Sequence, residues 1–132
     1  MLIERLEDLD AWCEARILAK FVYQIIRNIP KIEQYNIVKH MRECARSIPA
    51  NIAEGFGRYN YQESMQFYRI ARGSLNELKS DCYLSLDNDF VFKEDFEKAM
   101  DQIEKVNQLL NGLIRSTSRR KAQHLSRQAN NV

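Results

Sequence analysis

The chain has 132 residues, of which 45% are hydrophobic and 29% charged, the balance of a single globular domain rather than a disordered chain. Four glycines and two prolines are too few for an all-β fold with many tight turns, and no apolar run approaches the length of a membrane span. The net charge of +2 is unevenly distributed, because residues 115–132 hold five cations and no acid, leaving fifteen cations against eighteen acids, a net charge of −3, in residues 1–114.

The first predicted helix runs from about Asp8, a residue type that favours the N-cap, to Ile29, where Pro30 ends it. The second begins near Gln34 and repeats its apolar residues in steps of three and four: Met41, Ala45, Ile48, Ile52 and Phe56. This period passes through Pro49 without a break. Proline removes one helical hydrogen bond and clashes with the preceding turn, at a cost of about 3 kcal/mol, so we expect a helix that is kinked at Pro49 rather than ended there.

The third predicted helix opens at Asn60, three residues before Glu63 as in a capping box, and closes at Asp87 and Asn88. Its apolar stripe consists of Tyr68, Ala71, Leu75, Leu78 and Cys82. The fourth starts near Lys93, and its apolar residues have the spacing of a heptad seam: Phe96, Ala99, Ile103, Val106, Leu110 and Leu113. No segment alternates like a strand and the connections are short. The sequence therefore predicts an all-α fold, an antiparallel up-down four-helix bundle over residues 1–114.

Residues 115–132 are predicted to form a flexible basic tail. Leu125 and Val132 are its sizeable aliphatic residues, too little apolar surface to offset the conformational entropy of the chain. The five cations of this tail are Arg115, Arg119, Arg120, Lys121 and Arg127.

The cysteines Cys13, Cys44 and Cys82 are widely spaced and fall at apolar-face positions, so we expect buried thiols and no disulfide framework. His40 and Cys44 stand four residues apart, a spacing that can hold a metal. A zinc site, however, needs about four ligands, and the chain has no CxxC or HExxH motif, so we expect no metal and no cofactor. The first twelve residues carry acids where a signal peptide would be apolar, which indicates a cytoplasmic protein with no membrane partner.

The segment SIPANIAEGFGR, residues 47–58, raises two hypotheses for Asn51 and Glu54. Both belong to a polar stripe about a third of a turn from the apolar one, made of Ser47, Asn51, Glu54 and Arg58. In one hypothesis they form an active site; in the other they bond across helices or subunits, with Gly55 and Gly57 allowing close backbone approach. The chain shows no nucleophile–base pair and no phosphate-binding glycine loop, so the structural role is favoured and no enzyme is expected.

The third predicted helix repeats this mixture of small and charged residues, with Arg69, Gly73 and Glu77 four residues apart and Ser74 beside them. We therefore expect a tight, polar helix contact. The residues assigned to packing or assembly are Ser47, Pro49, Asn51, Glu54, Gly55, Gly73 and Glu77. Another face of the second helix carries a basic stripe of Lys39, Arg42 and Arg46.

SIPANIAEGFGR and QFYRIARGSLNEL, residues 66–78, together resemble the double motif of the bacterial four-helix-bundle family encoded within intervening sequences of 23S rRNA genes. The resemblance spans about residues 8–114 and extends to the accessory variability determinants of diversity-generating retroelements, which assist a reverse transcriptase. It implies a homopentameric, barrel-like assembly without catalytic activity. In the retroelement group it also implies a basic surface that contacts the reverse transcriptase and nucleic acid, but no shared motif transfers those basic positions to this chain.

Two hypotheses for function follow. In the first, the basic stripe and the basic tail contact the phosphates of a nucleic acid, RNA in particular, and a closed homo-oligomer multiplies the contact. In the second, the protein is a scaffold whose partner is a polymerase or another subunit, and Tyr59, Tyr61 and Phe67 form its docking patch. The acidic body and the possibility of a merely solvated basic face weigh against the first hypothesis. Both genomic contexts, rRNA gene and retroelement, stay open.

Overall fold

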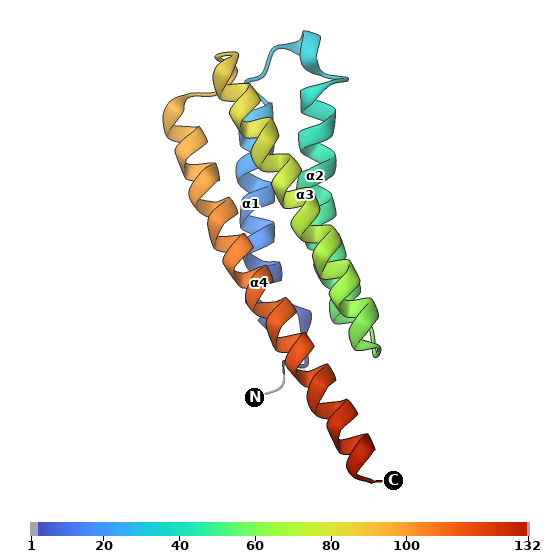
Figure 1. The fold of residues 1–132 in the computed structure, drawn as a ribbon. Helices are drawn as coiled ribbons and strands as arrows, with labels where there is room; N and C mark the ends of the chain where they lie inside the picture. The colour runs from blue at the N-terminus through green and yellow to red at the C-terminus, as the bar shows by residue number, and fades with distance from the viewer. Residues whose placement is uncertain (1–2, 132) are drawn as a thin grey trace.

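The computed structural model describes residues 3–131, and within this range the chain is helical with no strand (Figure 1). Its four α-helices are α1 (Asp10–Ile26), α2 (Ile37–Phe56), α3 (Tyr61–Asp87) and α4 (Lys93–Asn130). Single 3-10 turns, η1 (Leu6–Asp8) and η2 (Lys31–Glu33), precede α1 and α2. Each helix packs against its neighbours in the order α1, α2, α3, α4 and back to α1, so α2 and α4 lie diagonally. The predicted all-α, four-helix fold is confirmed.

The core lies where the four predicted apolar stripes meet. On α3 every residue of the predicted stripe is buried, and on α4 the central residues Ala99, Ile103, Val106 and Leu110 are buried. Cys44 and Cys82 are buried thiols, as expected. Cys13 is only half-buried and donates a hydrogen bond to the backbone oxygen of Glu7 at 3.1 Å.

The connection between α1 and α2, at the top of Figure 1, begins earlier than predicted, whereas α3 closes at Asp87 and Asn88 as predicted. Helix α1 ends at Ile26, because the residue before Pro30 is pushed toward extended backbone and the intervening residues close tighter turns. The predicted cap at Asp8 is wrong: Asp8 lies in η1, and Leu9 occupies the N-cap of α1. Asn60, by contrast, caps α3 as predicted, since its side-chain oxygen accepts from the backbone N–H groups of Gln62 and Glu63.

Helix α2 continues through Pro49 to Phe56, so the apolar period did predict a helix that resumes beyond the proline. The buried residues Ile48 and Ile52 on either side of Pro49 both face the core. The kink itself stays a prediction.

The largest difference from expectation concerns the C-terminal segment. Residues 115–130 are helical and continue α4, where the sequence predicted a flexible tail. The segment is rich in Arg, Lys, Ala and Gln, which favour helix, and extending an existing helix avoids the cost of nucleation. We call residues 115–130 the basic extension; Val132 lies outside the described residues.

The basic extension projects past the connection between α2 and α3 (Figure 1). Its first turns lean on α3: Lys121 Nζ donates to Gln62 Oε1 at 2.6 Å, and the His124 ring packs edge-on against Tyr61. Residues 122–131 are otherwise exposed. Between residues 3 and 131, no helix has the length and apolarity needed to cross a membrane.

Candidate functional site

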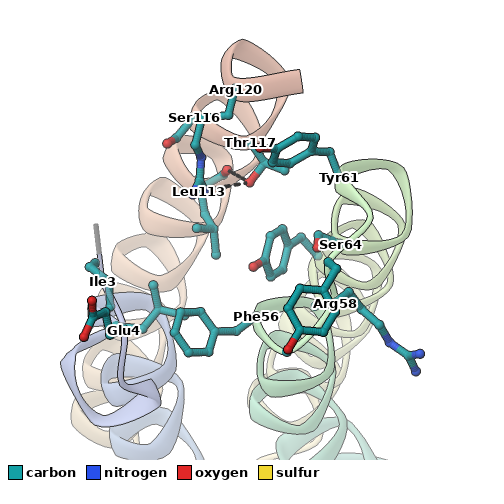
Figure 2. Close-up of a pocket in the computed structure, with 15 residues that line it drawn as sticks. Ile3, Glu4, Phe56, Arg58, Tyr61, Ser64, Leu113, Ser116, Thr117 and Arg120 are labelled. Carbon is teal, nitrogen blue, oxygen red and sulfur yellow. Dashed lines mark hydrogen bonds between the residues drawn. The ribbon is translucent and has the colours of Figure 1, made fainter. Parts of the chain in front are cut away.

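A cavity of about 900 Å³ opens at the end of the bundle where the basic extension leaves it (Figure 2). Four parts of the chain enclose it: the segment before α1, the end of α2, the start of α3, and α4 at the base of the extension. Figure 2 shows Phe56 at the bottom of this space with Leu113 pointing down toward its ring, and Tyr61 and Thr117 above. The closing turn of the SIPANIAEGFGR motif is therefore part of a concave surface, which the sequence did not reveal.

Tyr68 and Arg120 are two of the polar residues that line the cavity. Burial raises the pKa of the Tyr68 phenol, and the positive charge of Arg120, which lines the same cavity, opposes this rise. Arg120 also donates to Thr117 Oγ1 at 3.4 Å, and Thr117 itself donates to the backbone oxygen of Leu113 at 2.8 Å. A cationic group thus stands at the junction between the cavity and the basic extension.

The basic extension presents its charge to solvent. Arg115, Arg119, Arg120 and Arg127 are exposed, and Lys121 is half-buried against α3. At 100° per residue the four arginines fall within an arc of about 140° on the helix. Among residues 3–131, no carboxylate forms an ion pair with any of these five cations. The extension is therefore a helix with one basic face.

The basic stripe on α2 is separate from this face. Lys39, Arg42 and Arg46 are all exposed, as predicted for a surface group, but Lys39 Nζ lies 3.9 Å from Glu43 Oε1. Because α2 and α4 are diagonal in the bundle, the stripe and the extension do not form one continuous surface.

The predicted polar stripe of α2 faces α3 in its first half. Ser47 Oγ lies 2.9 Å from Ser74 Oγ, and Asn51 Nδ2 donates to the oxygen atoms of Ser47 at 2.8 and 3.0 Å. Glu54 forms an exposed pair with Arg58, which lies just beyond the C-cap of α2, with a nitrogen–oxygen distance of 3.0 Å. Asn51 thus supports a hydroxyl contact between helices, whereas Glu54 makes no contact with α3 through these bonds.

The glycines differ in their surroundings. Gly55 is buried, and a Cβ atom placed on it would lie 2.5 Å from the Tyr68 ring and 3.0 Å from the backbone oxygen of Ser64. Gly73 faces open space, with nothing within 4 Å of such a Cβ. Gly55 therefore allows close approach of α2 to α3, while the tight contact predicted at Gly73 is not formed within the described chain.

Beyond Ser74, the α2–α3 contact continues into a cluster that the sequence analysis identified only in part. His40 Nδ1 lies 2.5 Å from Asp81 Oδ2, and His40 Nε2 lies 3.1 Å from Glu77 Oε2. Cys44 Sγ lies 3.8 Å from the same Glu77 oxygen. We call these four residues the His40 cluster. Each helix supplies two of these residues, four positions apart. This spacing could point to the cluster only after α2 and α3 are known to be neighbours.

The electrostatics of the His40 cluster follow from its two carboxylates. The hydrogen bond with Asp81, and then that with Glu77, raise the pKa of His40 above its ordinary value, although partial burial opposes the rise. Burial raises the pKa of the Cys44 thiol to about 12, and both carboxylates add to the effect. In the chain alone the two carboxylates therefore favour the protonated form of the His40 imidazole, and burial keeps the Cys44 thiol neutral. Such a thiol is not a nucleophile.

The three aromatic residues of the predicted docking patch differ in exposure and contacts, and the patch itself stays a prediction. Tyr59 is fully exposed, but the Arg58 guanidinium lies over the Phe67 ring and His124 packs against Tyr61. Tyr59 is thus the most exposed of these three rings.

The sequence profile of the 23S rRNA-intervening sequence protein family matches residues 7–112. The chain belongs to that family. The match covers most of the four-helix bundle and ends before the basic extension. The predicted resemblance to this family is confirmed; the link to retroelement accessory proteins is not part of that match.

A crystal structure with a similar fold is that of a protein with unknown function from the S23 ribosomal protein family of Bacteroides thetaiotaomicron. The two chains superpose with a TM-score of 0.73 at 18% identity, over 79% of this chain and 97% of the other. At this identity the likeness shows the fold alone. No curated protein matches the chain.

Proposed function

We propose that this family member is a non-catalytic, cytoplasmic accessory protein that assembles as a closed homo-oligomer, a pentamer, and associates with RNA. The observation that carries the proposal is the basic extension, an exposed helix with five cations and no acid. Cations without a carboxylate partner are free to exchange their counterions for phosphates. The family's association with rRNA genes supports RNA as the nucleic acid.

The end of the bundle around the extension supports single-stranded RNA in particular. Proteins bind single strands by combining cations for the phosphates with aromatic rings on which unpaired bases stack. Tyr59 offers a fully exposed ring beside Arg58, and Arg120 stands at the cavity between this turn and the extension. A strand that follows the arginine face would pass this turn.

Oligomerisation would strengthen a weak contact. One extension offers at most five phosphate contacts per chain, but copies on one assembly act together at a high effective concentration. A closed ring also has no unpaired contact surfaces at which it would continue to grow.

The test is binding of a fluorescently labelled single-stranded RNA at several salt concentrations. One variant replaces the arginine face with glutamine, which preserves helix propensity: Arg115→Gln, Arg119→Gln, Arg120→Gln and Arg127→Gln. We expect weaker binding and a salt slope that is flatter by about 0.7 for each lost contact with a single strand.

The matched control removes four cations at the other end of the bundle: Arg27→Gln, Lys31→Gln, Lys79→Gln and Lys93→Gln. This control changes the net charge by the same amount but leaves the basic extension intact. Its salt slope should therefore stay close to that of the natural chain. Superimposable binding curves for all three proteins would show that the extension is not the RNA-binding element. No binding by the natural chain at low salt would contradict RNA association altogether.

The second candidate function is a protein–protein scaffold, which the full exposure of Tyr59 favours. A polymerase such as a reverse transcriptase would be its partner. In that case Tyr59→Ala would weaken capture of the partner while RNA binding stays unchanged.

A further inference from the structure

The His40 cluster brings together nitrogen, sulfur and oxygen donors on two rigid helices. One donor atom each of His40, Cys44 and Asp81 lies within 4.8 Å of the others, and Glu77 adds a carboxylate at the solvent side. The packing of α2 against α3 does not require this combination of donors, because hydroxyl pairs such as Ser47 and Ser74 connect the same two helices further along.

We propose that His40 Nε2, Cys44 Sγ and Glu77 Oε2 bind a zinc ion, and that Asp81 orients the imidazole. The three donors are separated by 3.8 Å from sulfur to nitrogen, 3.8 Å from sulfur to oxygen and 3.1 Å from nitrogen to oxygen. Donors on a tetrahedral zinc with bonds of 2.0–2.3 Å are about 3.3–3.6 Å apart, so small shifts suffice to enclose the ion.

Asp81 contacts the ring nitrogen of His40 that does not bind the ion. Its carboxylate accepts from His40 Nδ1, the pairing that fixes the ring and increases the basicity of a metal-binding histidine in carboxylate–histidine–zinc triads. Asp81 is buried while the His40 ring is 43% exposed, so the ring has solvent on one side and an anchored partner on the other. Cys44 Sγ is almost equally far from both ring nitrogens, at 4.0 and 3.8 Å. The ring therefore has to turn slightly to direct Nε2 at the ion.

The donor set selects the metal. A thiolate and an imidazole favour zinc over magnesium or calcium, which prefer oxygen ligands. Binding releases the thiol proton of Cys44 and a ring proton of His40 to solvent, because the ion binds the thiolate and the neutral imidazole. Three protein ligands leave the fourth position to a water molecule, and the exposed Glu77 marks the side from which the ion enters.

The experiment uses the full chain, reduced and stripped of metal with a chelator, and titrates it with Zn²⁺ by calorimetry and with Co²⁺ by absorption. We expect one Zn²⁺ per chain, a thermal midpoint that rises with Zn²⁺ but not with Mg²⁺, and a thiolate-to-cobalt charge-transfer band with tetrahedral visible bands.

The ligand variants are Cys44→Ser, which should abolish the charge-transfer band, and Glu77→Gln. Because Glu77 is exposed, Glu77→Gln keeps the proposal testable even if the Cys44 variant folds poorly. Asp81→Asn should weaken Zn²⁺ binding by about 10–100-fold, as loss of an orienting partner does, and Glu77→Gln by at least as much.

The controls are Cys13→Ser and Glu97→Gln, a half-buried thiol on α1 and an exposed acid on α4. They should bind Zn²⁺ like the natural chain. The proposal is overturned if the natural chain gives no charge-transfer band, or if Cys44→Ser and Glu77→Gln bind Zn²⁺ as tightly as the controls do.

Discussion

Gly55 and Gly57 stand two residues apart in the closing turn of α2, but only one of them is needed for packing. Gly55 lies against the Tyr68 ring and the backbone of α3, so any side chain there would push the two helices apart. Gly57 is exposed, and a Cβ atom on it would meet only the backbone oxygens of its own helix at 3.6 Å or more. At the scale of single residues, close helix approach is localised at Gly55.

We therefore expect Gly55→Ala to lower the free energy of unfolding by about 1–3 kcal/mol, the usual cost of overpacking. Gly57→Ala, the matched control, should be neutral or stabilise the chain by up to about 1 kcal/mol, because its backbone already has helical angles. Urea unfolding followed by circular dichroism measures both. Equal midpoints for the two variants would contradict the role assigned to Gly55.

Among the elements, α4 differs from the others because its second part has little of the bundle to pack on. Thr117 is buried, and Lys121 and His124 contact the start of α3, so the helix is supported up to His124. Residues 125–131 are exposed and make no contact of this kind among the described residues. The bundle therefore extends further along α4 than the apolar seam predicted.

Two truncations locate the end of the folded unit. Removing residues 125–132 should leave the thermal midpoint nearly unchanged, because residues 125–131 are exposed. Removing residues 115–132 should lower the stability by about 1–2 kcal/mol, since Thr117 and the contacts to α3 are lost as well. Differential scanning calorimetry compares the three chains. If the longer truncation melts like the full chain, the extension is a tail without a part in the fold.

At the scale of the whole molecule, α3 carries a surface that the single chain does not use. Gly73 is exposed in a helix interior, where glycine costs about 1 kcal/mol relative to alanine, and nothing lies within 4 Å of a Cβ placed there. Ile70 beside it is 45% exposed. The proposed homo-oligomer offers a reason for both, namely a neighbouring subunit that approaches α3 closely at Gly73.

Gly73→Leu tests this contact, because leucine favours helix and has open space in the single chain. We expect a folded chain of unchanged or higher thermal stability that no longer assembles, as measured by light scattering. Gln108→Leu, which adds the same side chain to the exposed face of α4, should assemble normally. Assembly of the Gly73 variant with the mass of the natural oligomer would place the subunit interface elsewhere, and a monomeric natural chain would refute assembly.

The sequence by itself determined the four helices, because each carries enough apolar residues at helical spacing to require a buried face. It also determined the continuation of α2 through Pro49 and the cap at Asn60, since both depend on residues only a few positions apart. The family followed from two short motifs whose residues are all local.

Only the tertiary structure decided which polar residues meet. His40 and Asp81 are 41 residues apart, and whether they face each other depends on the rotation of α2 and α3 about their axes, which the burial of both apolar stripes fixes. The cavity where the basic extension leaves the bundle is also decided by the tertiary structure. Four separate segments line it, and no repeat in the sequence indicates that they meet. Composition alone also could not predict that the basic extension is helical. The extension continues a helix that is already nucleated, and contacts with α3 stabilise it.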